Sequence, residues 1–125
     1  MKRFAIVTGA SKGLGRAFAL ELGSRGINTI LVSLPGEDIH LLNEEIISTY
    51  KTSSVFFEVD LSDYDNVISF SKSINEMYSI FLLINNAGIG GTMKFGDAPV
   101  NLVNKIMQLN IMAVAVLTRQ LIPNL

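Results

Sequence analysis

Near its start the chain reads Phe4-Ala5-Ile6-Val7-Thr8-Gly9-Ala10-Ser11-Lys12-Gly13-Leu14-Gly15-Arg16-Ala17-Phe18, and the rest of the architecture follows from this stretch. An apolar run ends in a turn punctuated by glycine, and a helical pattern begins at Leu14. A strand, a glycine turn and a helix in this order present free backbone N–H groups and the positive end of a helix to a phosphate. Gly9, Gly13 and Gly15 let a ligand approach the backbone closely, because they have no side chain. The stretch favours a phosphate-binding turn, and a tight strand-to-helix turn without a ligand is the alternative.

The composition bounds the class of protein. The 125 residues suit a single domain, residues 1–125, in which 49% of the residues are hydrophobic and 17% are charged. The net charge is -1, from 10 Lys and Arg against 11 Asp and Glu, so we expect no nucleic-acid partner. The absence of cysteine excludes disulfides, thiolate metal sites and cysteine nucleophiles, and no metal site is predicted.

The start of the chain and its apolar runs bear on location. Only a few apolar residues follow Met1-Lys2-Arg3 before Gly9, too few for the apolar region of a signal peptide. No uninterrupted run approaches the ~18 apolar residues of a membrane span. We therefore expect a cytoplasmic protein without membrane contact.

Strands and helices alternate along the chain. After the opening turn, strands are expected at residues 29–32, 55–59 and 80–84, and the last of these is apolar at every position, as in a strand covered on both faces. Ser62-Asp63-Tyr64-Asp65 resembles a capping box before a helix. Apolar residues at helical spacing lie between the strands: Leu14, Ala17, Phe18 and Leu22; Ile39, Leu42 and Ile46; Val67, Phe70, Ile74 and Met77. This alternation predicts an α/β fold with a doubly wound parallel sheet.

A last helix, from about Pro99 to Ile122, leaves almost no polar face. A helix that is apolar all round must be covered all round. One side can pack on the sheet, and the other needs a partner.

Four short motifs in this order resemble the short-chain dehydrogenase/reductase family. Thr8-Gly9-Ala10-Ser11-Lys12-Gly13-Leu14-Gly15 is similar to its cofactor turn, and Asn85-Asn86-Ala87-Gly88 to its N-N-A-G segment after the fourth strand. Asp60-Leu61 stands where the family places an adenine-contacting acid and its neighbour, and Asn110 matches an asparagine on the following helix. The resemblance covers the whole chain but only the first half of the family's length. It implies a Rossmann-like, three-layer αβα fold that is incomplete at the C-terminus.

The motif residues have physical reasons to bind a dinucleotide. The N–H groups around Ser11 to Leu14 can donate to a pyrophosphate at the positive end of a helix. Asp60 can accept from the adenine amino group, or it is only an acid at a helix start. Asn86, Ala87 and Gly88 end a strand beside the first one, where ligands bind such sheets, unless they form an ordinary turn. Asn85 is expected to tie neighbouring strands together with its amide.

We predict NADP(H) rather than NAD(H). An acid at the end of the second strand holds the ribose 2′-hydroxyl of NAD, and here Ser33 and Leu34 stand there. Lys12 can pair with a 2′-phosphate, and Ser33 can add a donor. Glu37 or Asp38 folding back to the ribose would argue against NADP(H), although Asp38 is better read as a helix N-cap.

Most of the catalytic set implied by the resemblance is missing. Relatives use a tyrosine, a lysine four residues later and a serine, and none of Tyr50, Tyr64 and Tyr78 has a lysine at that offset. Asn110, which in the family holds a water linking the lysine to solvent, is the catalytic residue present.

The resemblance implies an oxidoreductase that interconverts a small-molecule carbonyl and an alcohol. We expect the 125 residues alone to be inactive. The last helix is expected to be covered by another copy of the chain, which would make a homo-oligomer, or by the half of the family's domain that this sequence does not include. The alternative is a non-catalytic dinucleotide-binding or protein-interaction module, complete at 125 residues.

Overall fold

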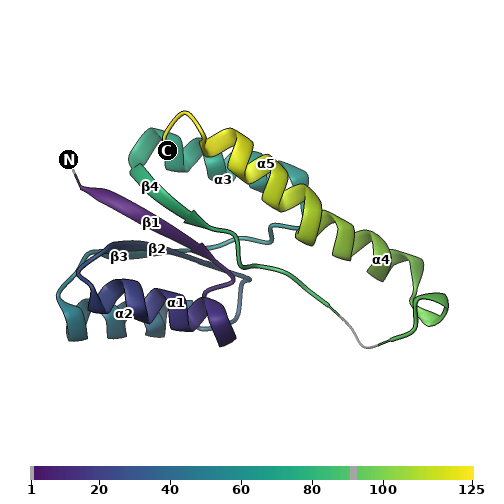
Figure 1. Cartoon of the computed structure of the whole chain (residues 1–125), viewed down its shortest axis with the longest axis horizontal. Coiled ribbons are helices and arrows are strands. Elements are labelled where there is room, and N and C mark those ends of the chain that lie inside the picture. Colours follow the sequence, from purple (N-terminus) through teal and green to yellow (C-terminus); the bar gives the residue numbers. More distant parts are fainter. Residues whose placement is uncertain (1, 91–92) are drawn as a thin grey trace.

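The computed structural model describes residues 2–90 and 93–125. Within them, four parallel strands form one sheet in the order β3-β2-β1-β4 (Figure 1). The strands are β1 (Arg3–Thr8), β2 (Asn28–Ser33), β3 (Ser54–Glu58) and β4 (Ser79–Ile84). The strand order reverses at β1, which lies between β2 and β4, so the carboxyl ends of these strands form the crevice where open α/β sheets bind ligands.

Helices cover both faces of the sheet. Figure 1 shows α1 (Gly13–Ser24) and α2 (Ile39–Tyr50) on one face, and α3 (Tyr64–Met77) and α5 (Ala113–Leu121) on the other. The prediction of a three-layer, doubly wound α/β fold of the Rossmann type is therefore confirmed.

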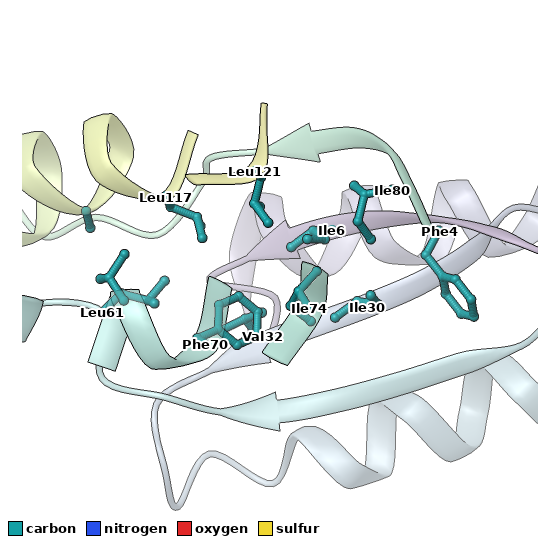
Figure 2. Packing of buried hydrophobic residues seen from close by; sticks show 12 residues of the cluster. Phe4, Ile6, Ile30, Val32, Leu61, Phe70, Ile74, Ile80, Leu117 and Leu121 are labelled. Carbon is teal, nitrogen blue, oxygen red and sulfur yellow. The ribbon is translucent and has the colours of Figure 1, made fainter. Parts of the chain in front are cut away.

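The core is divided by the sheet into two clusters, because successive side chains of a strand point to opposite faces. On β1, Phe4 and Ile6 join the cluster under α3 and α5, while Ala5 and Val7 join the cluster under α1 and α2. Figure 2 shows the first cluster, into which Leu117 and other labelled side chains point from helices and strands. Complete burial of such side chains stabilises the fold by about 1.5–3 kcal/mol each.

The start of α3 differs from the predicted capping box. The N-cap is Asp63, and its Oδ1 accepts a hydrogen bond of 3.0 Å from the backbone N–H of Asn66. Ser62 lies outside the helix and donates instead to Asp60. The prediction was wrong by one residue because Ser62 and Asp63 are both residue types that favour this position.

The expectation that β4 is covered on both faces was wrong for these residues. Ile80 is buried, but Phe81 is 38% exposed and the following residues are half-buried. β4 pairs with β1 on one side and is the edge of the sheet on the other. An apolar strand at an edge is exposed to pairing with another strand.

The last helix is three segments rather than one α-helix. These are α4 (Val100–Met107), the π-helix η2 (Gln108–Met112) and α5. α5 packs on α3 and the sheet. α4, whose residues are all described by the structure, has no buried residue and projects beyond the sheet (Figure 1). The helix is therefore covered at its C-terminal end and not all round, contrary to the prediction.

By length and composition, the helix Val100–Leu121 also meets the requirements of a membrane span. Its 22 residues include a window of mean hydropathy 1.5, of which 17% is buried. Counting uninterrupted apolar residues does not detect this helix, because single polar residues interrupt its apolar run. Core helices of soluble proteins have the same properties, so the finding is weak evidence for a membrane.

Candidate dinucleotide-binding site

A cavity of about 240 Å³ lies at the carboxyl ends of the strands. It brings together the turn after β1, the end of β2, the residues after β3 and the segment after β4. The predicted site residues that line it are Gly9, Ser11, Lys12, Ser33, Leu61, Asn86, Ala87 and Gly88. The other lining residues are Leu34 and Glu37, which the sequence analysis weighed only as neighbours of the ribose, and Val32, Val59, Ile89 and Leu109, which it did not consider.

Two of the glycines are required by close packing. A Cβ on Gly9, whose φ is +64°, would lie 2.9 Å from the Cα of Ala87. A Cβ on Gly15 would clash with the carbonyl of Gly9 and lie 2.5 Å from the Asn86 side chain. These glycines therefore let the first turn of α1 pack directly against the segment after β4.

Gly13 has a different role. Its φ is +58°, and no described atom lies within 4 Å of the place where a Cβ would be. The first N–H groups of any α-helix have no partner within the helix. The N-cap of α1 is Lys12, and among the described residues its side chain makes no capping hydrogen bond. The start of α1 thus has backbone donors and open space in front of Gly13, but Gly13, Leu14 and Gly15 do not themselves line the cavity.

Thr8 joins the ends of β1 and β4 and was not predicted to do so. Its hydroxyl oxygen accepts from the N–H groups of Asn86 and Ala87, each at 2.9 Å, and donates to the carbonyl of Ile84 at 3.4 Å. Thr8 is 2% exposed. A hydroxyl can both donate and accept, so this one side chain binds the first residues after β4 to the end of β1.

Of the two asparagines after β4, Asn86 rather than Asn85 ties the strand ends together. The Asn86 amide donates to the carbonyl of Gly9 at 3.1 Å and so ties the two strand ends together. Asn85, which was predicted to tie the strands, donates to Thr118 of α5 at 3.0 Å instead. Adjacent side chains on an extended segment point in opposite directions, so only one of the two amides can reach Gly9.

At the end of β2, the hydroxyl of Ser33 does not offer a donor to a ligand. Ser33 is 3% exposed and donates to the carbonyl of Leu34 at 3.0 Å. The carboxylate of Glu37, which the sequence analysis considered as a partner of the ribose, turns toward the glycine turn, where the Ser11 hydroxyl donates to it at 2.7 Å. Asp38 is the N-cap of α2, but its φ is 54° and its side chain makes no capping hydrogen bond in the described structure.

Asp60 and Leu61 lie on opposite sides of the chain after β3. Leu61 is buried and lines the cavity. Asp60 faces a second, more open hollow and accepts hydrogen bonds from the hydroxyl of Ser62 at 2.6 Å and from its N–H at 3.0 Å. The Ser62 hydroxyl is the main cause that lowers the pKa of Asp60, although partial burial opposes it. The Asp60 carboxylate is thus held by a local turn and does not line the cavity.

Asn110 lies in the π-helix η2, on the helix that follows the segment after β4. Its amide N–H donates to the carbonyl of Ile89 at 2.6 Å, and its Oδ1 accepts from the N–H of Ile89 at 2.9 Å. The asparagine therefore connects the middle of the last helix to the segment after β4. Among residues 2–90 and 93–125, no group of three or more His, Asp or Glu residues forms a metal site.

Comparison with known proteins extends these observations. A yeast protein from Lodderomyces elongisporus, named very-long-chain 3-oxoacyl-CoA reductase, is 41% identical over 87 residues, which are 68% of this chain and 25% of that protein. An orangutan protein (Pongo abelii), named inactive hydroxysteroid dehydrogenase-like protein 1, is 36% identical over 87 residues, 70% of this chain and 26% of that protein.

A solved structure gives the same comparison in three dimensions. The crystal structure of a metagenomic short-chain oxidoreductase in complex with NADP has a TM-score of 0.90 and 27% identity to this chain. The alignment covers 98% of this chain and 56% of that one. The chain therefore spans about half of the solved relative, and its matches cover about a quarter of the two curated relatives.

The family model of the short chain dehydrogenases matches residues 3–125, which is nearly the whole chain. The match agrees with the parallel sheet, the glycine turn and the segment after β4, and it establishes the family. The chain belongs to the short-chain dehydrogenase/reductase family of oxidoreductases.

Proposed function

We propose that this chain is the dinucleotide-binding part of an NADP(H)-dependent reductase that interconverts a carbonyl and an alcohol. The observation that carries the proposal is the cavity between the glycine turn and the segment after β4. In this proposal the tyrosine that transfers the proton, the lysine that lowers its pKa and the serine that polarises the substrate oxygen belong to residues outside this sequence.

The residues fit a dinucleotide. The positive end of α1, the open space in front of Gly13 and the uncapped first turn suit a pyrophosphate. The apolar wall formed by Val32, Val59 and Leu61 suits a flat base. When bound, the nicotinamide supplies or accepts the hydride, and this chain's residues hold and orient the nucleotide.

Lys12 supports the preference for NADP(H). Its side chain is 84% exposed at the rim of the cavity, and neither Ser33 nor Leu34 places a carboxylate at the end of β2. A charge-assisted hydrogen bond to a 2′-phosphate contributes about 1.5–3 kcal/mol, which corresponds to tenfold or more in affinity. The NADP complex of the metagenomic relative is consistent with this preference.

The yeast relative suggests a substrate class to test first. Its name specifies the reduction of 3-oxoacyl thioesters of coenzyme A. A ketone of that class is therefore the first substrate to try with any longer form of the protein.

A non-catalytic binding module is the second candidate, because one relative is named as inactive. Under either candidate we expect these 125 residues to bind nucleotide without turnover. The reading frame after Leu125 distinguishes the reductase from the binding module. The reductase requires a Tyr-x-x-x-Lys sequence there, and the binding module does not.

The last helix is proposed to carry an interface between copies. Its exposed apolar residues include Val100 (84%), Met107 (52%) and Ile111 (55%), and covering them would remove apolar surface from water. Analytical ultracentrifugation tests this interface, and a stable monomer at high concentration would exclude it.

The test of the cofactor proposal is calorimetric titration of the chain with NADPH and NADH. We expect NADPH to bind about tenfold more tightly than NADH, and Lys12→Met to abolish that difference. Lys72→Met, at an exposed position of α3, is the matched control and should change neither affinity. Equal affinities in the wild type would contradict the preference for NADP(H), and absence of binding would contradict the proposed function.

A further inference from the structure

Glu37 lies across the part of the cavity where a cofactor phosphate is expected. The Ser11 hydroxyl donates to Glu37 Oε1 at 2.7 Å, and Lys12 Nζ lies 3.9 Å from Glu37 Oε2. Ser11 and Lys12 belong to the turn after β1, while Glu37 comes from the loop between β2 and α2. All three residues line the cavity.

The carboxylate is much less exposed than its cationic partner. The side chain of Glu37 is 29% exposed, against 84% for Lys12. The adjacent backbone directs it toward the turn, because Gly36 and Asp38 on either side have φ values of +83° and 54°. The N–H of Gly36 also donates to the Glu58 carboxylate at 3.2 Å, which ties the loop to the end of β3.

These contacts make Glu37 a competitor for the anion that Lys12 is proposed to bind. A carboxylate and a phosphate both accept from hydroxyl and ammonium donors, and two anions at one place repel each other. The Ser11 hydroxyl and the Lys12 ammonium cannot serve Glu37 and a phosphate equally well at the same time. A 2′-phosphate would have to displace the carboxylate, whereas a nucleotide without that phosphate would not compete for these donors.

We infer that Glu37 is a specificity-determining residue whose carboxylate occupies the Ser11–Lys12 anion site and opposes the binding of a 2′-phosphate. The inference rests on the proposed dinucleotide function.

The test is the variant Glu37→Gln, which removes the charge and keeps the shape of the side chain. We expect NADPH to bind on the order of tenfold more tightly to this variant, because one like charge is removed from an accessible site. The affinity for NADH should stay within about twofold, since NADH carries no 2′-phosphate. Glu45→Gln is the matched control, because Glu45 also pairs with a cation of α1, Arg16 at 3.2 Å, but does not line the cavity.

The possible results separate this inference from the proposed function. Weaker NADH binding by Glu37→Gln would overturn the inference, because Glu37 would then hold the ribose 2′-hydroxyl. Unchanged affinities, or equal changes for both nucleotides, would overturn it as well. A wild type that prefers NADH would contradict only the NADP(H) proposal, and a selective gain for NADPH in the variant would still support the role of Glu37. Failure of the wild type and both variants to bind either nucleotide would overturn the proposed function and this inference with it.

Discussion

Replacing Thr8 with valine removes one hydroxyl and keeps the size and branching of the side chain. The hydroxyl accepts from the N–H groups of Asn86 and Ala87 at 2.9 Å and donates a weaker bond to Ile84 at 3.4 Å. In Thr8→Val the two N–H groups lose their acceptor in a partly buried place.

The expected cost follows from those bonds. Each lost hydrogen bond of this kind destabilises by about 1 kcal/mol, and more where the group left behind has no access to water. We therefore expect Thr8→Val to lower the free energy of unfolding by about 2–3 kcal/mol. For a domain of this size that corresponds to a fall in Tm of about 10 °C. The same variant should weaken NADPH binding, because the hydroxyl positions the segment that lines the cavity.

Thr8→Ser is the matched control. It keeps the hydroxyl and loses one buried methyl group, which costs about 1 kcal/mol. Urea unfolding followed by circular dichroism measures both variants. The reasoning predicts that serine is better tolerated than valine. If packing alone determined the stability, the order would be reversed, and a valine variant at least as stable as the serine variant would refute this account of Thr8.

Three further predictions concern the glycine turn, the core and the acid at β3. Gly15→Ala should destabilise by about 2–4 kcal/mol and weaken NADPH binding, while Gly96→Ala, with no described atom near its Cβ, should change neither in the same titrations. Leu117→Ala should cost about 2–5 kcal/mol in urea unfolding, because Leu117 is 1% exposed, whereas Ile111→Ala at 55% exposure should cost less than about 1 kcal/mol. Asp60→Asn should lower the free energy of unfolding at neutral pH, and this difference from the wild type should disappear in acid. The reason is that a lowered pKa means that the ionised carboxylate stabilises the fold. This stabilisation is complete above the ordinary pKa of 3.8 and is lost as the pH falls through the lowered pKa. Unfolding curves from about pH 7 to about pH 2 measure this, and a difference that stays constant over that whole range would contradict it.

The sequence was sufficient to predict the order of strands and helices, the parallel sheet and the place of the cavity. Apolar periodicity changes between two and about 3.6 residues along the chain, and glycines mark the first turn. The exact partners of polar side chains were beyond this reasoning. Asn85 and Asn86 differ by one position, and only the twist of the segment after β4 decides which amide reaches Gly9.

Three features of the site had no signal in local patterns. The sequence predicts only a strand position for Thr8, because threonine favours strands whether or not its hydroxyl makes a hydrogen bond. The direction of Glu37 depends on two left-handed residues in its loop, and the non-glycine one, Asp38, could not be foreseen. The π-helix at Asn110 is hidden because the surrounding helix is apolar on nearly every face, so a shift in its phase leaves the pattern unchanged.

The pair of hydrogen bonds between Asn110 and Ile89 also closes a loop of chain whose ends are 21 residues apart. Closing a loop costs little more when it is longer, about 0.6 kcal/mol for each doubling of its length. Additional residues inserted between these two anchors would therefore be inexpensive and would leave the nucleotide cavity where it is. Such residues would lie outside the four strands, so the parallel sheet under the cavity would keep its pairing.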